Sequence, residues 1–198
     1  MQEQTIEAAP ETPAIRYAYK ASLIGAAHRF ELTEEGLCWR LAGRSGVWPY
    51  ADIAAIRLSY RPVSMQQHRF RADIRHVSGA RISILSTSWQ TAALMAPQDN
   101  DYRTFIIELH SRLEKLGSKA ELIAGLGRKT YVAALALLAL VGVMLSALFI
   151  RAIAIGEWAG ALFFVGFAAL FGWQVGGFVR RNRPLAYTFD HIPQALLP

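Results

Sequence analysis

The chain has 198 residues, a formal net charge of +6 and a mean hydropathy of +0.22. This length suits one domain of ordinary size plus a membrane segment. Its one cysteine, Cys38, excludes an internal disulfide framework and a cysteine-based metal site. Most of the excess positive charge follows residue 127, where it flanks two apolar runs, so we attribute it to membrane topology and expect no nucleic-acid partner.

Residues 1–14, "MQEQTIEAAPETPA", are polar, acidic and interrupted by prolines, which is typical of a disordered tail. From residue 26 to residue 85, apolar and polar side chains alternate over short runs such as "AIRLSYR" and "HRFRADIRH". Turns at residues 33–36 and at Ser78-Gly79 separate these runs. Sequential strands joined by short turns predict an antiparallel meander.

An amphipathic helix is predicted after the strands. Six apolar residues recur at helical spacing before Gly117: Tyr102, Phe105, Ile106, Leu109, Leu113 and Leu116. Next, "SKAE" is typical of a capping box and predicts a second, shorter connecting helix within residues 118–130. The fold class expected for residues 15–117 is therefore α+β, with an antiparallel β-barrel or sandwich capped by one C-terminal helix.

Two runs without a charged residue follow, over residues 131–150 and 158–179. At about 1.5 Å per residue each run reaches roughly 30 Å, the thickness of a bilayer's hydrocarbon core. They predict an all-α transmembrane hairpin. Gly172 and Gly176 form a GxxxG pair, which predicts close helix packing. We favour packing within the hairpin over packing between two copies of the chain.

Charged residues beside the two runs predict the orientation of the hairpin. The turn between the runs carries one basic residue, Arg151, whereas the outer flanks carry Arg128, Lys129, Arg180, Arg181 and Arg183. By the positive-inside rule, both termini should lie in the cytoplasm of a multi-pass protein of the cell inner membrane. Residues 180–198 then form a cytosolic tail, too interrupted by proline for a helix. Three of its apolar side chains are expected to be able to dock on the domain: Tyr187, Phe189 and Ile192.

The stretches "FELTEEGLCW", "WPYADIAAIRL" and "ARISILSTSW", with the helix after them, resemble the bacterial pleckstrin-homology-like (PH-like) domains. The resemblance covers about residues 20–117 and rests on pattern, not on a catalytic motif. It implies a seven-stranded, strongly bent sheet capped by a helix and used for binding. Many such bacterial domains are joined to transmembrane helices. Eukaryotic relatives bind phosphoinositides through basic residues between their first two strands, whereas the equivalent turn here, residues 33–36, is acidic.

We predict no catalytic, cofactor-binding or metal-binding residues. The five histidines lack ligand spacing, and "GLGRKT" lacks the glycine and the preceding strand of a phosphate-binding loop. The most suggestive pattern is a set of arginines that alternate with apolar residues on consecutive strands: Arg57, Arg61, Arg69, Arg71, Arg75 and Arg81. Many of them should share one sheet face. That face either binds anionic lipid headgroups or an acidic protein partner near the membrane, or is simply solvated.

Together these features predict a membrane-anchored, non-enzymatic PH-like binding or scaffolding module at the cytosolic face of the inner membrane. The alternative is a small accessory subunit of a transporter or envelope complex that docks through its transmembrane hairpin. The lipid bilayer is a partner in both interpretations, and both leave room for a homo-oligomer.

Overall fold

The structure is a computed structural model that describes residues 15–62, 68–91 and 94–198. Its first sheet has four consecutive antiparallel strands in the order β1-β2-β3-β4. They are β1 (Ile15–Tyr19), β2 (His28–Leu32), β3 (Leu37–Leu41) and β4 (Arg44–Trp48). Leu32 is buried and Arg29 is exposed, because the period-2 pattern gives this sheet one buried and one solvated face.

A second sheet has the strand order β11-β10-β5-β6-β7. Its antiparallel meander consists of β5 (Ile53–Pro62), β6 (His68–His76) and β7 (Arg81–Leu85). Next to it, β10 (Glu121–Ala124) runs parallel to β5, and β11 (Leu185–Ala186) runs antiparallel to β10. Four short elements complete the domain: the 3₁₀ turns η1 (Tyr50–Asp52) and η2 (Gln194–Leu196), and the paired strands β8 (Thr87–Trp89) and β9 (Met95–Pro97).

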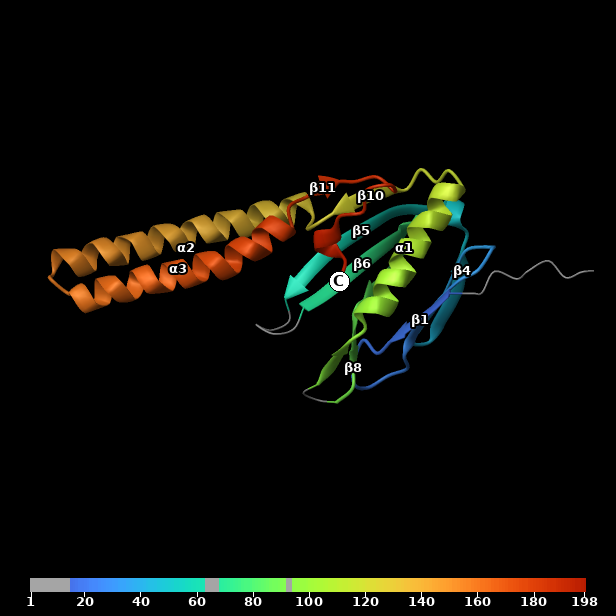
Figure 1. Ribbon diagram of the computed structural model, residues 1–198, viewed down its shortest axis with the longest axis horizontal. Helices are drawn as coiled ribbons and strands as arrows, with labels where there is room; N and C mark the ends of the chain where they lie inside the picture. The colour runs from blue at the N-terminus through green and yellow to red at the C-terminus, as the bar shows by residue number, and fades with distance from the viewer. Residues whose placement is uncertain (1–14, 63–67, 92–93) are drawn as a thin grey trace, which may run out of the picture.

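Helix α1 (Asp99–Lys115) packs its apolar side against the sheets (Figure 1). Its buried side chains include Tyr102, Phe105 and Leu109, at the spacing that the sequence predicts. They share one core with Phe30 of the first sheet and Ile74 of the second. Burying each such side chain contributes about 1.5–3 kcal/mol, so this core is what closes the two sheets on each other.

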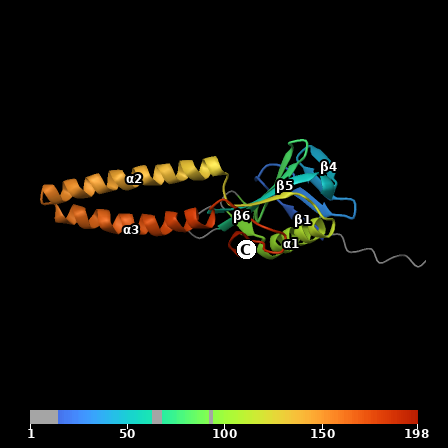
Figure 2. The same ribbon diagram turned by 90° about the horizontal axis from the view of Figure 1, so that it is seen from above.

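Two long helices, α2 (Arg128–Ala154) and α3 (Trp158–Arg181), project from the domain as an antiparallel hairpin (Figures 1 and 2). Both are long and apolar enough to cross a membrane. Their apolar side chains are exposed, with Leu137 at 63%, Val143 at 68% and Trp173 at 86% exposure. The α+β class, with antiparallel sheets and two long apolar C-terminal helices, is confirmed.

The helical hairpin takes the place of a turn between two paired strands. It leaves the domain after β10 and returns at β11, and Ala124 pairs directly with Leu185. Each connection is short, with residues 125–127 on one side and 182–184 on the other. The α2–α3 hairpin is therefore an insertion within the folded domain rather than an appendage at its end.

The connecting helix predicted for residues 118–130 is wrong, because residues 121–124 form β10. Leu122 and Ala124 are buried, and Glu121 is exposed, which is a strand pattern. The Ser118 hydroxyl accepts from the Ala120 N–H within a turn and does not cap a helix. The open edge of β5 pairs with this segment, and that pairing overrides the local helix signal.

The folded domain also extends beyond residue 117, where the sequence places its end, because the C-terminal tail belongs to the domain. Leu196 and Leu197 are buried in the core. Tyr187, Phe189 and Ile192 are partly buried against it, which is the docking that the sequence suggests. Residues on both sides of the helical hairpin thus complete one core.

Replacing residues 125–184 by Asn-Gly should give a soluble, folded domain. Ala124 and Leu185 already face each other on antiparallel strands, and Asn-Gly is the favoured two-residue turn for such a pair. A chain that ends at Gly117 should fail to fold, since it lacks β10, β11 and the buried tail residues. Thermal melting by circular dichroism distinguishes them: a cooperative transition in the shorter chain, or none in the Asn-Gly chain, would contradict the insertion.

Tail docking should weaken at mildly acidic pH because of His110 on α1. Its Nδ1 lies 2.7 Å from the Ile106 carbonyl and its Nε2 2.8 Å from the Tyr187 hydroxyl. Burial lowers the pKa of His110 below its ordinary value, against a smaller opposing effect of the Ile106 hydrogen bond. Below about pH 6.5 the unfolded chain therefore binds a proton that the folded chain does not, so stability falls until the lowered pKa is reached.

This expectation can be measured as the free energy of unfolding between about pH 7.5 and 5.5, where most carboxylates stay ionised. Stability should fall as the pH falls, and His110→Gln should flatten the slope. His191→Gln, which removes an exposed histidine of the tail, is the matched control. Equal slopes in His110→Gln and the unaltered chain would show that His110 is not responsible.

Candidate functional site

Strand register brings the six predicted arginines onto the outer face of the second sheet. Directly opposed residues in an antiparallel pair lie on the same face. The opposed pairs are Arg57–Asp73, Ser59–Arg71, Arg61–Arg69 and Arg75–Arg81. We call this surface the arginine face: Arg57, Arg61, Arg69, Arg71, Arg75 and Arg81.

Asp73 neutralises the middle of the arginine face. Its Oδ1 accepts hydrogen bonds from Arg71 Nε at 2.7 Å and from Ser83 Oγ at 2.6 Å. Arg71 Nη2 also donates to Ser83 Oγ at 3.0 Å. Arg71 is therefore engaged within the sheet, and the face is divided into two cationic ends rather than forming one continuous patch.

The end formed by Arg75 and Arg81 is exposed and partly compensated. Arg75 Nη2 lies 3.4 Å from a carboxylate oxygen of Glu121 on β10. An exposed ion pair of this kind contributes at most about 1 kcal/mol. At this end Glu121 therefore compensates part of the positive charge but stabilises the arginines only weakly.

The end formed by Arg61 and Arg69 holds two directly opposed cations. Arg69 Nε donates to the Thr87 hydroxyl at 2.9 Å. No carboxylate among residues 15–62, 68–91 and 94–198 lies within 4.0 Å of either guanidinium. Burial is the main cause that lowers the pKa of Arg69, and the positive charge of Arg61 acts in the same direction. Both effects favour an external anion at this end.

Arg57 lies where β5 meets the start of α2. Its Nη1 would be 3.0 Å from a Cβ added to Gly127, the residue before α2. Its Nε is buried and has no hydrogen-bond acceptor among the described residues. The Arg57 guanidinium therefore packs against the connection before α2 and places a positive charge at the base of the hairpin.

Asn182, directly after α3, fixes the hairpin base to the sheet. It is fully buried, and its Oδ1 accepts from the Tyr60 N–H at 3.0 Å. Its backbone carbonyl accepts from the Leu126 N–H at 3.0 Å, which joins the two connections. Gly125 has a φ of +79°, and an added Cβ there would collide with the Asn182 carbonyl. The junction therefore leaves the helices little freedom relative to β5.

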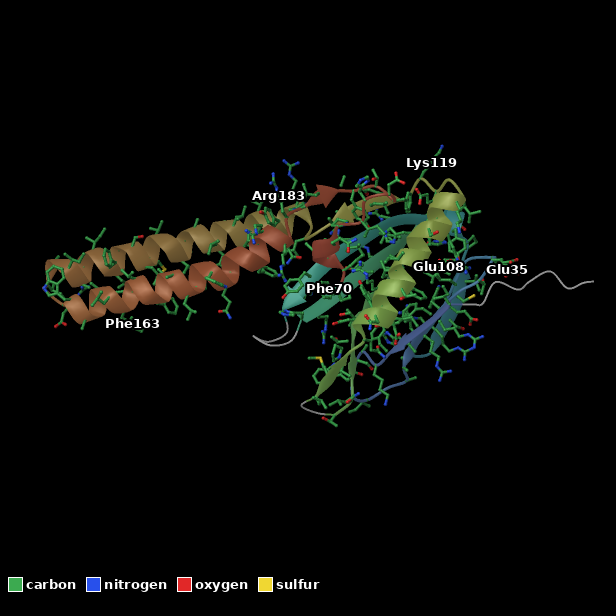
Figure 3. The ribbon with its side chains drawn as sticks, viewed as in Figure 1. Glu35, Phe70, Glu108, Lys119, Phe163 and Arg183 are labelled. Atoms are coloured by element: carbon green, nitrogen blue, oxygen red, sulfur yellow. The ribbon has the colours of Figure 1, made fainter. Side chains whose placement is uncertain are left out.

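The Arg61–Arg69 end lies beside this base. Asn182, at the end of α3, is hydrogen bonded to the Tyr60 N–H, the residue before Arg61 on β5. The Arg181 guanidinium lies over the Tyr60 ring, at 5.0 Å from its centroid, on the sheet face opposite to the Arg61 side chain. Figure 3 shows Arg183 at the base of the hairpin and Phe70, from the start of β6, near the end of α3. Five basic residues cluster at the helix ends of the base: Arg128, Lys129, Arg180, Arg181 and Arg183.

The packing expected within the hairpin at Gly172 and Gly176 is not found. An added Cβ at either glycine would meet nothing within 4 Å in the described chain. The two helices approach closely near their turn instead, where Ala152 and Ala161 are buried. Farther along, their seam opens into a groove of about 480 Å³, lined in part by Gly142, Ser146, Phe164, Phe171 and Gly172. Gly172 thus faces this open groove, and the helices are too far apart there for close packing.

The described residues contain no cluster of three or more His, Cys, Asp or Glu side chains that could hold a metal ion. The histidines of β6 are engaged locally. His68 Nδ1 is hydrogen bonded to the Tyr60 hydroxyl, and His76 Nδ1 lies 2.8 Å from the Ser78 hydroxyl. His76 is also 3.8 Å from a carboxylate oxygen of Asp52.

Comparison with protein-family models, curated proteins and solved structures finds no match for this chain.

A second basic surface was not predicted from the sequence. The outer face of the first sheet carries a hollow of about 670 Å³, lined in part by Arg16, Arg29 and Arg40. The alternation of Arg29 with Phe30 and of Arg40 with Trp39 contains the signal, since both arginines must point away from the core. Their direct opposition across β2 and β3 depends on register, which that alternation alone does not give.

Proposed function

We propose that the chain is a membrane-anchored, non-enzymatic binding module of the PH-like type, held at the cytosolic face of the inner membrane by α2 and α3. One observation carries the proposal. A hairpin with apolar side chains exposed all round is inserted between two paired strands, so any membrane that covers it also holds the domain at two points.

The exposed surface of α2 and α3 supports insertion into lipid. In the most apolar window of each helix, none of the residues is buried within the chain. Leaving so many large apolar side chains in water would cost about 25 cal/mol per Å², whereas a bilayer removes this cost. At about 1.5 Å per residue both helices exceed the roughly 30 Å needed to span.

The arrangement of charge supports the proposed orientation. The hairpin base carries five basic residues, and the opposite turn carries Arg151 alone. Lys and Arg are retained on the cytoplasmic side of short membrane hairpins. The folded domain, which is attached to the base, would then lie in the cytoplasm together with both chain ends.

The sheet arrangement supports the PH-like assignment. The resemblance implies seven strands and a capping helix, and β1–β4, β5–β7 and α1 supply them. Two strands, β10 and β11, extend the second sheet beyond that plan. They serve to join the helical hairpin to the domain.

The Arg61–Arg69 end of the arginine face is the best-placed binding surface for anionic headgroups. It lies next to the hairpin base and has no carboxylate partner among the described residues. Each Lys or Arg near an anionic membrane surface contributes about 1 kcal/mol. Binding there would hold the tethered domain in one orientation against the bilayer.

Membrane fractionation and reporter fusions test the anchoring. The full chain should sediment with membranes and resist alkaline extraction, because two spans are buried in lipid. The chain in which Asn-Gly replaces residues 125–184 should stay in the supernatant. A reporter that works only in the cytoplasm should be active when it is fused to either terminus. Recovery of the full chain in the supernatant of a detergent-free lysate would overturn the proposal.

Headgroup binding can be tested with the full chain in lipid nanodiscs. Nanodiscs with anionic lipid should raise the melting temperature of the domain by about 4–8 °C over zwitterionic ones, since two arginines contribute about 2 kcal/mol together. Arg61→Ser with Arg69→Ser should abolish this increase.

The matched control is Arg75→Ser with Arg81→Ser. It removes the same charge from the same sheet face but at the other end, so the increase should remain. If both pairs reduced the increase equally, the effect would come from net charge and not from a directed surface.

A second candidate function, an accessory subunit of a membrane complex, is favoured by one observation. The α2–α3 seam has an open groove, and a Cβ added at Gly172 or Gly176 would meet nothing within 4 Å in the described chain. Another helix could occupy that space through close backbone contact. A stoichiometric membrane protein retained by the helical hairpin alone after gentle solubilisation would support this function.

A further inference from the structure

The outer face of the first sheet contains a built hollow that faces away from the core. Two complete cross-sheet rows form it: Arg16–Glu31–Cys38–Val47 and Ala18–Arg29–Arg40–Ser45. We call this surface the sheet hollow. Its volume is about 670 Å³, and the small side chains of Ala18, Cys38 and Ser45 leave room between the long arginines.

The charges of the sheet hollow are unbalanced. Arg16 Nε lies 2.9 Å from a carboxylate oxygen of Glu31, so these two compensate each other. Arg29 and Arg40 stand directly opposite each other on β2 and β3. Within the described part of the chain no carboxylate lies within 4.0 Å of either. Directly opposed like charges destabilise a strand pair, so a bound anionic group would be stabilised here.

Lipid headgroups are a poor match for this hollow. The first sheet lies at the end of the domain that is remote from α2 and α3, in both views of the molecule (Figures 1 and 2). The short connections at the hairpin base prevent the domain from turning that end toward a membrane around the helices. The occupant must therefore come from the soluble side.

The chain itself carries an anionic segment that immediately precedes β1 in the sequence. Residues 1–14 contain Glu3, Glu7 and Glu11 and no lysine or arginine. This segment leads directly into β1, whose second residue, Arg16, lines the hollow.

The segment is also long enough to reach both arginines. At about 3.3 Å per residue, the five residues from Glu11 to Arg16 can span about 17 Å. Arg40 lies two strands from β1, a distance across the sheet of about 10 Å. A segment tethered this closely has a local concentration in the millimolar range, so even weak ion pairs suffice.

We infer that the sheet hollow is a binding site for an acidic peptide segment, and that residues 1–14 of the same chain occupy it with their carboxylates at Arg29 and Arg40. The contact is electrostatic and largely exposed, so salt weakens it. Any soluble partner that uses this site must present an acidic segment that displaces the chain's own.

Cys38 provides the measurement, because it is the one cysteine of the chain and lines the hollow. The full chain in detergent micelles is treated with a neutral maleimide, and the rate of thiol modification is followed across pH. The rate constant of the thiolate, taken from the high-pH limit of this series, is the quantity compared between variants. It reports access to the sulfur and does not depend on the fraction of thiol that is ionised. Replacing Glu3, Glu7 and Glu11 by Gln should raise this rate about fivefold.

Salt should act on the same contact. Raising the salt from about 0.1 M to 1 M shortens the screening length from about 10 Å to 3 Å. The rate should therefore rise with salt in the unaltered chain but not in the triple variant.

Glu34→Gln with Glu35→Gln is the matched control for the tail variant. It removes exposed carboxylates from the turn between β2 and β3, and the Cys38 rate should not change. A synthetic peptide of residues 1–14, added to the triple variant, should slow the modification again. This protection should disappear when Arg29 and Arg40 are also replaced by Ser.

Two outcomes would overturn the inference: equal Cys38 rates with and without the three tail glutamates, or peptide protection that survives loss of both arginines. Neither outcome depends on the membrane proposal, since the hollow and the helical hairpin are measured separately.

Discussion

The pairing of β10 with β11, fixed by Asn182, is the constraint on which the other surfaces depend. This junction converts the helical hairpin from an appendage into the turn of a strand pair. Asn182 hydrogen bonds to the Tyr60 N–H of β5, and Leu126 hydrogen bonds to Asn182. Both connections are thereby held against the same strand. Under the proposed anchoring, a flexible tether would let any face of the domain meet the membrane, whereas this junction would present the end that carries Arg61.

Because the hairpin base is fixed to β5, the two basic sites of the domain lie at different distances from α2 and α3. Asp73 interrupts the arginine face, so Arg61 and Arg69 form one cationic site beside the hairpin base. Arg29 and Arg40 form another on the sheet remote from the helices. The two sites have the same sign but differ in what can reach them. Geometry, and not the net charge of +6, is what separates a surface suited to headgroups from one suited to an acidic segment.

The sequence predicts those features that depend on local periodicity. Alternation identifies the strands around Phe30 and Ile74, helical spacing identifies α1 through Tyr102, and the charge-free runs identify α2 and α3. The sequence pattern misassigns β10. The capping signal at Ser118 is local, whereas β10 pairs with β5, which lies more than 50 residues earlier in the chain. The burial of Leu196 and Leu197 and the neutralisation of Arg71 by Asp73 depend on long-range packing and strand register, which composition and spacing leave open. Spacing also leaves open how far apart the two helices lie at Gly172.

The junction must also reconcile two different spacings. Paired strands lie about 4.8 Å apart, but packed helices need about 8–10 Å between their axes. The connections of residues 125–127 and 182–184 therefore diverge within a few residues while remaining hydrogen bonded to each other. Gly125 accomplishes this with a left-handed backbone and without a side chain that would strike the Asn182 carbonyl. Because Gly125 donates to the Leu58 carbonyl and Asn182 accepts from the Tyr60 N–H, both helices diverge from points held on β5, and the strand sets where each helix begins or ends.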